Sequence, residues 1–259
     1  MIVIGAGRVG TGLRDAAVAA GVSCSLVSRV SGWEALDEVL GVPVLVAVRN
    51  DDLEVVLERV PAHRRPDLVF IQNGMVRPWL RSHALVGATR GLLFFAVPTR
   101  GAAIEPGGAS PFCGPRAAHV VHWLGQLGVP AQEVDWARFS AAELEKLIWN
   151  SAFGLLCQVH DADVGTVVTE HRGELGDLVR ELAAVGRAAM GVELPHDYLM
   201  DRLCDYSASI PTYKGSVKEW RWRNGWFDQV AARYRRQTPV HRSMLQGIGF
   251  GDRLALVDV

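Results

Sequence analysis

Gly5-Ala6-Gly7-Arg8-Val9-Gly10 follows directly on the apolar run 1–4, so three glycines stand in the order G-x-G-x-x-G at the start of the chain. The run predicts a buried strand, and residues 9–20 have the apolar spacing of an amphipathic helix. A glycine turn between a strand and a helix lets backbone approach a pyrophosphate at the helix N-terminus. The alternative is a glycine-rich turn that binds nothing. The residues predicted to form a dinucleotide site are Gly5, Gly7, Arg8, Val9 and Gly10.

The residues after this turn alternate between short apolar runs and segments with helical spacing, which is typical of a parallel sheet with crossover helices. The strands expected from the runs are 2–4, 23–27, 44–48, 68–71 and 92–97. The helices expected between and after them are 10–20, 32–40, 52–60 and 115–127, with a last short strand near Val134. This order predicts a doubly wound α/β domain of Rossmann type.

Beyond about Trp136 the apolar runs stop and helical spacing continues. The helices expected there are 141–158, 170–190, 197–206 and 226–236. The predicted fold is therefore α/β, with an N-terminal dinucleotide-binding domain over 1–136 and a C-terminal all-α domain over 137–259. The helical domain is expected to bind substrate and to provide any homodimer contact.

The composition limits the partners of the chain. Its 259 residues are 49% hydrophobic with a formal net charge of −1, which excludes a disordered chain and gives no positive surplus for nucleic acid. Four cysteines without a C-x-x-C pair, and no metal-ligand spacing among His160, His196 and His241, predict no metal and a reducing cytoplasm. The longest apolar runs are far shorter than the ~20 residues of a bilayer span, and no basic leader precedes the first strand. No membrane or nucleic-acid partner is expected.

The end of the second strand bears on the choice of cofactor, because NAD-binding chains carry Asp or Glu there to hold the adenosine ribose. This chain has Ser28-Arg29 instead. A guanidinium can hold a phosphate in two places, so Arg29 favours the 2′-phosphate of NADPH; the alternative is a surface arginine without a ligand. Arg49, after the third strand, either adds positive charge over the phosphates or pairs with Asp51 or Asp52.

Lys146 is one of only three lysines among the 27 basic residues, and it lies in a helix rich in large apolar side chains. Asn150 follows one turn later on the same face, so ammonium and carboxamide should point together. Partial burial would lower the pKa of Lys146, which could then protonate a carbonyl oxygen as hydride from a bound nicotinamide reaches the carbon. The alternative is an ordinary ion pair with Glu143.

Glu219 opens the aromatic stretch Glu219-Trp220-Arg221-Trp222-Arg223-Asn224-Gly225-Trp226. Tryptophan beside arginine could indicate base stacking on single-stranded nucleic acid, but the near-neutral charge favours tryptophans packed between helices. A carboxylate there could hold Lys146 in place or accept from a substrate hydroxyl. The alternative is an ion pair of Glu219 with Arg221 or Arg223.

Taken in order, these motifs resemble the ketopantoate reductase (2-dehydropantoate 2-reductase) family over essentially the whole chain. The resemblance rests on the glycine turn, on Gln72-Asn73-Gly74-Met75, on Lys146-Leu147-Ile148-Trp149-Asn150, on Glu219 ahead of Asn224-Gly225, and on Thr238-Pro239-Val240-His241-Arg242.

This resemblance implies an NADPH-dependent reductase that transfers hydride to the keto carbon of a small 2-oxo acid. The first candidate reaction is 2-dehydropantoate to pantoate, in pantothenate biosynthesis. Lys146 would be the general acid, and Glu219 would contact the lysine or the substrate hydroxyl. Asn73 would meet the nicotinamide end of the cofactor, Asn150 the substrate, and Arg29 would set the preference for NADPH.

Some positions depart from the family pattern. Gly154 stands one turn beyond Asn150, where the family commonly has a second asparagine, and Arg49 stands where the family usually has a lysine. The candidates for the serine that would bind the substrate carboxylate are Ser207, Ser209 and Ser216. The departures leave two alternatives: a related reductase of another 2-oxo acid or an imine, or a catalytically silent NADP(H)-binding regulatory protein.

Overall fold

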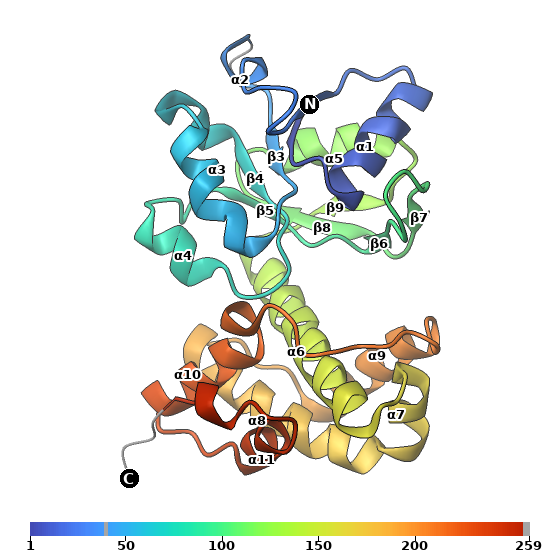
Figure 1. The fold of residues 1–259 in the computed structure, drawn as a ribbon, viewed down its shortest axis with the longest axis vertical. Coiled ribbons are helices and arrows are strands. Elements are labelled where there is room, and N and C mark those ends of the chain that lie inside the picture. The colour runs from blue at the N-terminus through green and yellow to red at the C-terminus, as the bar shows by residue number, and fades with distance from the viewer. Residues whose placement is uncertain (39–40, 256–259) are drawn as a thin grey trace. The chain divides into compact units, whose positions relative to one another are not determined.

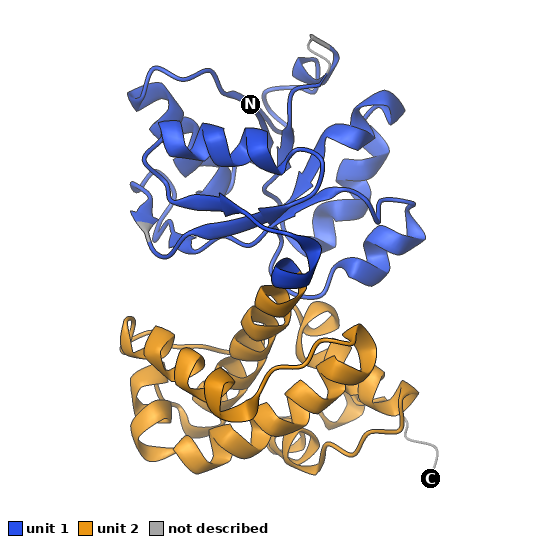
Figure 2. Cartoon of the chain, turned by 180° about the vertical axis from the view of Figure 1, so that it is seen from behind, with its two compact units in different colours: residues 1–139 blue, residues 140–259 orange. Residues whose placement is uncertain are grey.

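The chain divides into two compact units, Met1–Phe139 and Ser140–Val259 (Figures 1 and 2). The computed structural model describes residues 1–38 and 41–255. The boundary expected after residue 136 falls in the first turn of helix α6 (Trp136–His160), which begins in the first unit and continues in the second.

The first unit is built on a seven-stranded sheet in the order β2-β1-β3-β4-β5-β8-β9. Its strands are β1 (Ile2–Ile4), β2 (Ser25–Val27), β3 (Val44–Val46), β4 (Leu68–Phe70), β5 (Thr89–Gly91), β8 (Ser110–Cys113) and β9 (Ala131–Glu133). The first five strands pair in parallel, and β8 runs antiparallel to β5. The strand order reverses at β1, with β2 on one side and β3 on the other, which is the switch point where open α/β sheets bind ligands.

Helices cover both faces of this sheet (Figure 1). They are α1 (Arg8–Ala19), α2 (Ala35–Glu38), α3 (Leu53–Arg59), α4 (Arg77–Ser82) and α5 (Ala117–Gln126), with 3₁₀ turns η1 (Asn50–Asp52) and η2 (Ala62–Asp67). Val3, Leu45 and Val69 are neighbours in register and pack into one core with α1 and α5. Phe70, the next residue of β4, instead meets Trp79 of α4, with ring centroids 5.9 Å apart. Alternate strand residues therefore serve opposite helix layers, which confirms the predicted doubly wound fold.

One strand prediction is wrong, and the strand β8 was not predicted. The apolar run 92–97 is not the fifth parallel strand, which is β5; part of that run forms β6 (Phe95–Ala96), paired antiparallel with β7 (Glu105–Pro106) in a separate sheet. The ring of Phe112 on β8 occupies the place where Gly91 would carry a Cβ. Because β8 reads Ser-Pro-Phe-Cys, with a proline and no β-branched residue, its sequence gives a weak strand signal and no strand was expected there.

The expected helix 32–40 begins only at Ala35 as α2, and its residues 39–40 lie outside the described residues. The expected short strand near Val134 corresponds to β9, which ends at Glu133.

Regular structure in the described part of the second unit is helical throughout. Its elements are the body of α6, α7 (Val164–Glu170), α8 (Arg172–Met190), α9 (His196–Ala208), η3 (Trp220–Trp222), α10 (Asn224–Arg233), α11 (Pro239–Gly247) and η4 (Gly251–Arg253). Helix α8 packs against α7, α9, α10 and α11. The Leu144 side chain of α6 fills the space where Gly186 of α8 would carry a Cβ, so these two helices approach closely. The short helices α7 and α11 add to the four that were expected. No helix in the described residues is long and apolar enough to span a bilayer.

Candidate cofactor and active sites

Each of the three glycines in the first turn is glycine for a different structural reason. Gly5 has φ +112°, and a Cβ on it would stand 2.6 Å from the carbonyl oxygen of Ala47. A Cβ on Gly10 would collide with the carbonyl oxygen of Gly5, so only glycine lets α1 pack this close to β1. A Cβ on Gly7 would meet nothing within 4 Å. The first and third glycines are therefore fixed by packing, whereas the second leaves backbone open to a ligand.

The N-terminus of α1 is suited to an anion. Gly7 is its N-cap without a side-chain cap, and the first turn carries no acidic residue. Arg8 is exposed there, and its guanidinium donates to the carbonyl oxygen of Pro98 at 3.1 Å. Val9 is half-buried against the core under α1. The unbonded N–H groups of a first helical turn, together with the helix dipole, favour a phosphate at this point.

The strand register brings the predicted cofactor residues to one sheet edge. Ile4 pairs with both Val27 and Val46, so β1, β2 and β3 end level with one another. The loop after β2 is held by Ser28, whose Oγ accepts from the backbone N–H of residues 30 and 31 at 3.2 and 3.1 Å. Arg29 extends from this loop as an exposed side chain. It is therefore available to a ligand at the edge where Gly5 turns.

Asn73 lies at the same edge, after β4, in a loop fixed by two buried amides. Gln72 donates from Nε2 to the carbonyl oxygens of Val46, at 2.7 Å, and Val48, at 3.2 Å. Asn50 donates from Nδ2 to the carbonyl oxygen of Asn73 at 2.7 Å. The Asn73 side chain itself is exposed. Gln72 and Asn50 thus position this loop, a function that the sequence did not reveal because all three bonds are made to backbone distant in sequence.

Arg49 is exposed immediately before η1, after the end of β3. It joins Arg29 at the carboxyl edge of the sheet, next to a helix N-terminus and an open glycine backbone. These residues fit an anionic dinucleotide, because positive side chains and free N–H groups both face the edge where its phosphates would bind.

Lys146 lies on α6 in surroundings that disfavour its charge. Burial, together with the positive charge of Arg223, lowers the pKa of Lys146 to about 7 from an ordinary value of 10.5. An ammonium that titrates near neutrality can give up a proton at the working pH, as a general acid must.

Glu219 pairs with Arg223, which was the alternative noted from the sequence. The guanidinium of Arg223 donates to Oε2 of Glu219 at 2.6 Å. Glu219 holds a left-handed backbone, with φ +48°, at the start of η3. The Arg223 side chain is nearly buried, and its Nε has no hydrogen-bond partner among the described residues. Lys146, Arg223 and Glu219 thus form one charged group, in which the central guanidinium keeps a free donor.

The remaining predicted substrate residues differ in their surroundings. Asn150 lies one turn from Lys146 and donates from Nδ2 to its carbonyl oxygen at 2.7 Å. The Oγ of Ser209 donates to the carbonyl oxygen of Tyr206 at 2.6 Å, at the exposed end of α9. A Cβ on Gly154 would stand 2.8 Å from the carbonyl oxygen of Ser216. The backbone at Ser216 therefore fills the space beside α6 where a larger residue at 154 would project. Ser207 is buried, and its Oγ accepts from the indole of Trp149 at 2.9 Å.

The tryptophans after Glu219 are packed into the second unit. Trp222 and Trp226 are buried, and Trp220 lies over Gly225, where a Cβ would stand 2.6 Å from its indole Nε1. Asn224 and His241 are buried together, with the His241 Nε2 2.8 Å from Oδ1 of Asn224. Burial lowers the pKa of His241 to about 3, so it is neutral and donates to Asn224. These motif residues shape the helical unit.

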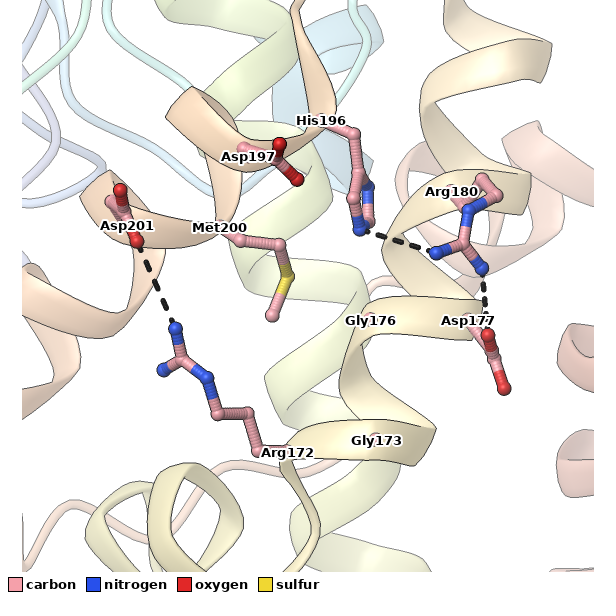
Figure 3. Close-up of a pocket in the computed structure, with 9 residues that line it drawn as sticks. All are labelled: Arg172, Gly173, Gly176, Asp177, Arg180, His196, Asp197, Met200 and Asp201. Atoms are coloured by element: carbon pink, nitrogen blue, oxygen red, sulfur yellow. Dashed lines mark hydrogen bonds and ion pairs between the residues drawn. The ribbon is translucent and has the colours of Figure 1, made fainter.

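A separate pocket of about 480 Å³ lies between α8 and α9 (Figure 3). Its lining residues are Arg172, Gly173, Gly176, Asp177, Arg180, His196, Asp197, Met200 and Asp201. Arg180 is 2.6 Å from Asp177, and Arg172 is 3.7 Å from Asp201. The charged groups therefore largely neutralise one another, and the pocket includes no residue predicted for the cofactor or the substrate.

Comparison with known proteins identifies the fold and one domain family. Over 98% of this chain and 99% of the other, the structure is similar to D-mandelate dehydrogenase solved with NADH, at 15% identity and TM-score 0.75. It is similar to 2-dehydropantoate 2-reductase from Methylococcus capsulatus over 95% and 94% of the two chains, at 20% identity and TM-score 0.74. It is also similar to a dimeric ketopantoate reductase from Staphylococcus aureus over 97% of both chains, at 14% identity and TM-score 0.70. No curated protein matches the chain in sequence.

These similarities, at 14–20% identity, show that the chain shares the fold of these proteins. Residues 138–250 match the family model described as "Ketopantoate reductase PanE/ApbA C terminal". The second unit thus matches the model of that C-terminal domain, which confirms the resemblance predicted from the sequence, with the low identities of a diverged relative.

Proposed function

We propose that this protein is an NADPH-dependent reductase of a small 2-oxo acid. The observation that carries the proposal is Lys146, whose pKa of about 7 makes it a proton donor near neutrality beside a partly unsatisfied guanidinium. An ammonium and an arginine are what a 2-oxo acid requires, because its keto oxygen must gain a proton and its carboxylate needs a cation.

Each residue of the charged group has a distinct task in this proposal. Lys146 gives its proton to the keto oxygen, so that the carbonyl becomes a hydroxyl. Arg223 binds the substrate carboxylate through the donors that Glu219 leaves free, including Nε. Glu219 holds the guanidinium in place and takes no proton itself. When bound, the nicotinamide supplies the hydride that the keto carbon accepts.

The preference for NADPH rests on Arg29, which is exposed at the end of β2 where no carboxylate follows the strand directly. Gly5, Gly7 and Gly10 would shape the turn at the pyrophosphate, and Asn73 would meet the nicotinamide end. Arg29 is placed to bind a 2′-phosphate, which NADH lacks.

The first substrate candidate is 2-dehydropantoate, which would place the protein in pantothenate biosynthesis. This candidate rests on the C-terminal family domain and on the relative from Methylococcus capsulatus. The similarity to D-mandelate dehydrogenase favours the alternative of another 2-oxo acid, because that enzyme has the same fold and is named for a different substrate, mandelate. Ser216, beside Gly154, stays a candidate for the carboxylate, whereas the Ser209 hydroxyl already has a backbone partner.

Two further properties belong to this proposal. A homodimer through the helical unit is favoured by the dimeric Staphylococcus aureus relative. Location in the cytoplasm is favoured by the four unpaired cysteines, which a reducing compartment maintains.

The test is oxidation of NADPH, and separately of NADH, by the purified chain with 2-dehydropantoate, phenylglyoxylate, other 2-oxo acids and cyclic imines. We expect turnover with at least one 2-oxo acid, faster with NADPH, and loss of turnover in Lys146→Ala. Arg223→Gln should raise KM for the acid far more than it changes KM for NADPH.

Tight NADPH binding without reduction of any compound in the panel would refute the reductase and favour the catalytically silent regulatory protein. Reduction of imines but not of 2-oxo acids would instead contradict the task given to Arg223, because an imine without a carboxylate needs no such cation.

A further inference from the structure

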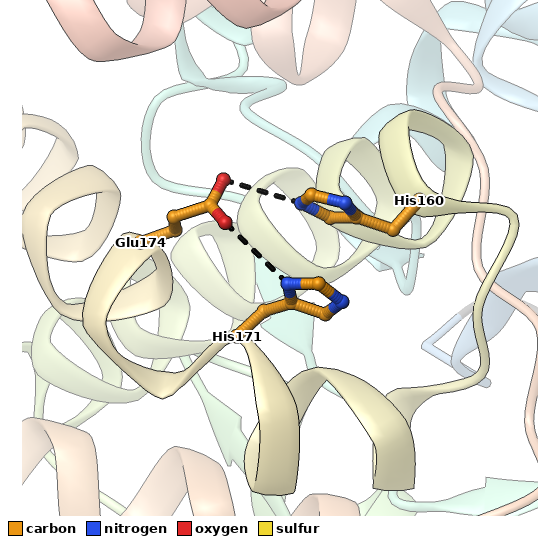
Figure 4. Close-up of side chains that lie close together, drawn as sticks. All are labelled: His160, His171 and Glu174. Atoms are coloured by element: carbon orange, nitrogen blue, oxygen red, sulfur yellow. Dashed lines mark hydrogen bonds and ion pairs between the residues drawn. The ribbon is translucent and has the colours of Figure 1, made fainter.

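Two histidines and a glutamate meet at the end of α6, outside the proposed active site (Figure 4). The imidazole rings of His160 and His171 are stacked, with centroids 3.6 Å apart and planes 11° from parallel. Nε2 of His160 is 3.2 Å from one carboxylate oxygen of Glu174, and Nδ1 of His171 is 3.4 Å from the other. One potential ligand atom from each residue lies within 4.8 Å of the other two.

The backbone brings these residues together from two helices. His160 is the last residue of α6, and Asp161 follows with a left-handed backbone, φ +47°. The short helix α7 then returns the chain to His171, which caps α8, and Glu174 lies one turn into that helix on the same side. The cluster therefore joins the end of α6 to the start of α8.

The charges around the cluster leave it open to a cation. Arg172, next in sequence to His171, directs its guanidinium to Sγ of Cys204, at 3.0 Å, and to Asp201, at 3.7 Å. Lys214 lies 3.7 Å from the carboxylate of Asp161. These two basic side chains thus have acidic or sulfur partners of their own, while the Glu174 carboxylate lies against the two imidazoles.

We infer that His160, His171 and Glu174 form a binding site for one divalent transition metal ion of the zinc type. Two imidazole nitrogens and one carboxylate oxygen are the donor set that Zn²⁺ accepts with a fourth position left to water. The side chains of His160, His171 and Glu174 are 23%, 22% and 48% exposed, so an ion can enter.

Binding requires a defined change in the cluster. The lone pair of an imidazole nitrogen lies in the ring plane, so two parallel rings cannot both direct a lone pair to one ion. The rings must rotate out of their stack, which their partial exposure allows. The bound ion would then connect α6 to α8 about 20 Å along α6 from Lys146, at 1.5 Å per residue. This inference is independent of the proposed reductase activity.

The test uses the full chain without a histidine tag, stripped of metal, and titrated with Zn²⁺ in a calorimeter. We expect saturable binding of one ion per chain. Each of His160→Ala, His171→Ala and Glu174→Gln should weaken Zn²⁺ binding by about tenfold or more. Co²⁺ should give visible d–d absorption of a low-coordinate site in the wild type and lose it in the variants.

Matched controls are Glu170→Gln, an exposed glutamate on α7, and His63→Ala, an exposed histidine in the first unit. Both should bind Zn²⁺ as the wild type does. Because Glu174→Gln keeps the shape of the side chain, its circular dichroism without metal should match the wild type, which separates loss of metal from loss of fold. Absence of saturable binding, or equal affinity in the wild type and all three cluster variants, would overturn the inference.

Discussion

The two units carry their functional features in different ways. In the first unit the features of the proposed cofactor site are mainly backbone: a turn of three glycines, an open helix N-terminus and strands that end level. In the second unit the proposed chemistry depends on side chains far apart in sequence, since Lys146 comes from α6 and Arg223 from the segment between η3 and α10. A backbone site can be predicted from a local motif, whereas a side-chain site needs the tertiary fold.

The largest expected effect is that of Lys146→Met in the second unit, which should change turnover and stability in opposite directions. Lys146→Met should lower kcat by about 10²–10⁴-fold, because the proton donor is removed. The same change should raise the thermal midpoint. The folded pKa of about 7 lies below the unfolded value of 10.5, so at pH 7 and below the charged lysine destabilises the fold, and this cost falls as pH rises between the two values.

The matched control for this prediction is Lys218→Met, at an exposed lysine. It should leave both the turnover and the thermal midpoint unchanged. Retained activity in Lys146→Met would contradict the claim that Lys146 donates the proton. An unchanged or lower thermal midpoint would contradict the claim that the buried charge of Lys146 destabilises the fold.

Loss of a buried guanidinium should destabilise the first unit. Arg64 is fully buried and donates to Asp67 at 3.0 Å and to the carbonyl oxygens of Leu36 and Val42 at 2.5 and 2.8 Å. Arg64→Met leaves these buried acceptors without the guanidinium donor. The substitution should therefore reduce the free energy of unfolding of this unit by roughly 3–5 kcal/mol. Urea denaturation, monitored through the loss of NADPH binding, would measure this free energy of unfolding. The matched control Arg81→Met, at an exposed arginine, should have the same free energy of unfolding as the wild type.

Cofactor choice is the next effect in size and tests the side-chain part of the first unit. Arg29→Ala should weaken NADPH binding by roughly 1.5–3 kcal/mol, the range for a hydrogen bond to a charged group, and leave NADH binding unchanged. Fluorescence titration with each cofactor measures the difference, with Arg81→Ala on α4 as control. Equal losses for both cofactors would show that Arg29 does not contact the 2′-phosphate.

The smallest effect concerns a motif that is structural. His241 is neutral in the fold with a pKa of about 3, below its unfolded value of 6.5, so its stabilising contribution is complete above pH 6.5 and decreases as pH falls toward 3. Between pH 7 and pH 5 the wild type should lose about 2 kcal/mol through this residue. His241→Gln keeps a donor for Asn224 and should lose less. If chemical denaturation gave the same pH dependence of the free energy of unfolding for the wild type and His241→Gln, this account would be contradicted.

The sequence was sufficient where the structural reason is local. The glycine turn, the alternation of strands and helices, and the helical second half all follow from spacing within short windows. The prediction of a strand over the whole of 92–97 is wrong, because an apolar run alone does not determine pairing: only Phe95–Ala96 is a strand, and it pairs with β7 outside the main sheet.

Long-range contacts account for what the sequence missed at the sites. The sequence indicates Arg223 only as an ion-pair partner of Glu219, because its proximity to Lys146 depends on how η3 and α10 fold back on α6. Spacing among the histidines gives no metal-ligand pattern for His160, whose neighbours in the fold are His171 and Glu174. Asn150 lies one turn from Lys146 because helical spacing alone determines it, and its amide donates to the Lys146 backbone carbonyl oxygen.

The most direct test of the central claim is the pH dependence of kcat/KM for reduction of the best 2-oxo acid, at saturating NADPH. If Lys146 donates the proton, kcat/KM should be constant below about pH 7 and fall about tenfold per pH unit above it. In the residual activity of Lys146→Met that decrease should be absent. A rate that stays constant well above pH 7, or the same decrease in Lys146→Met, would contradict the account.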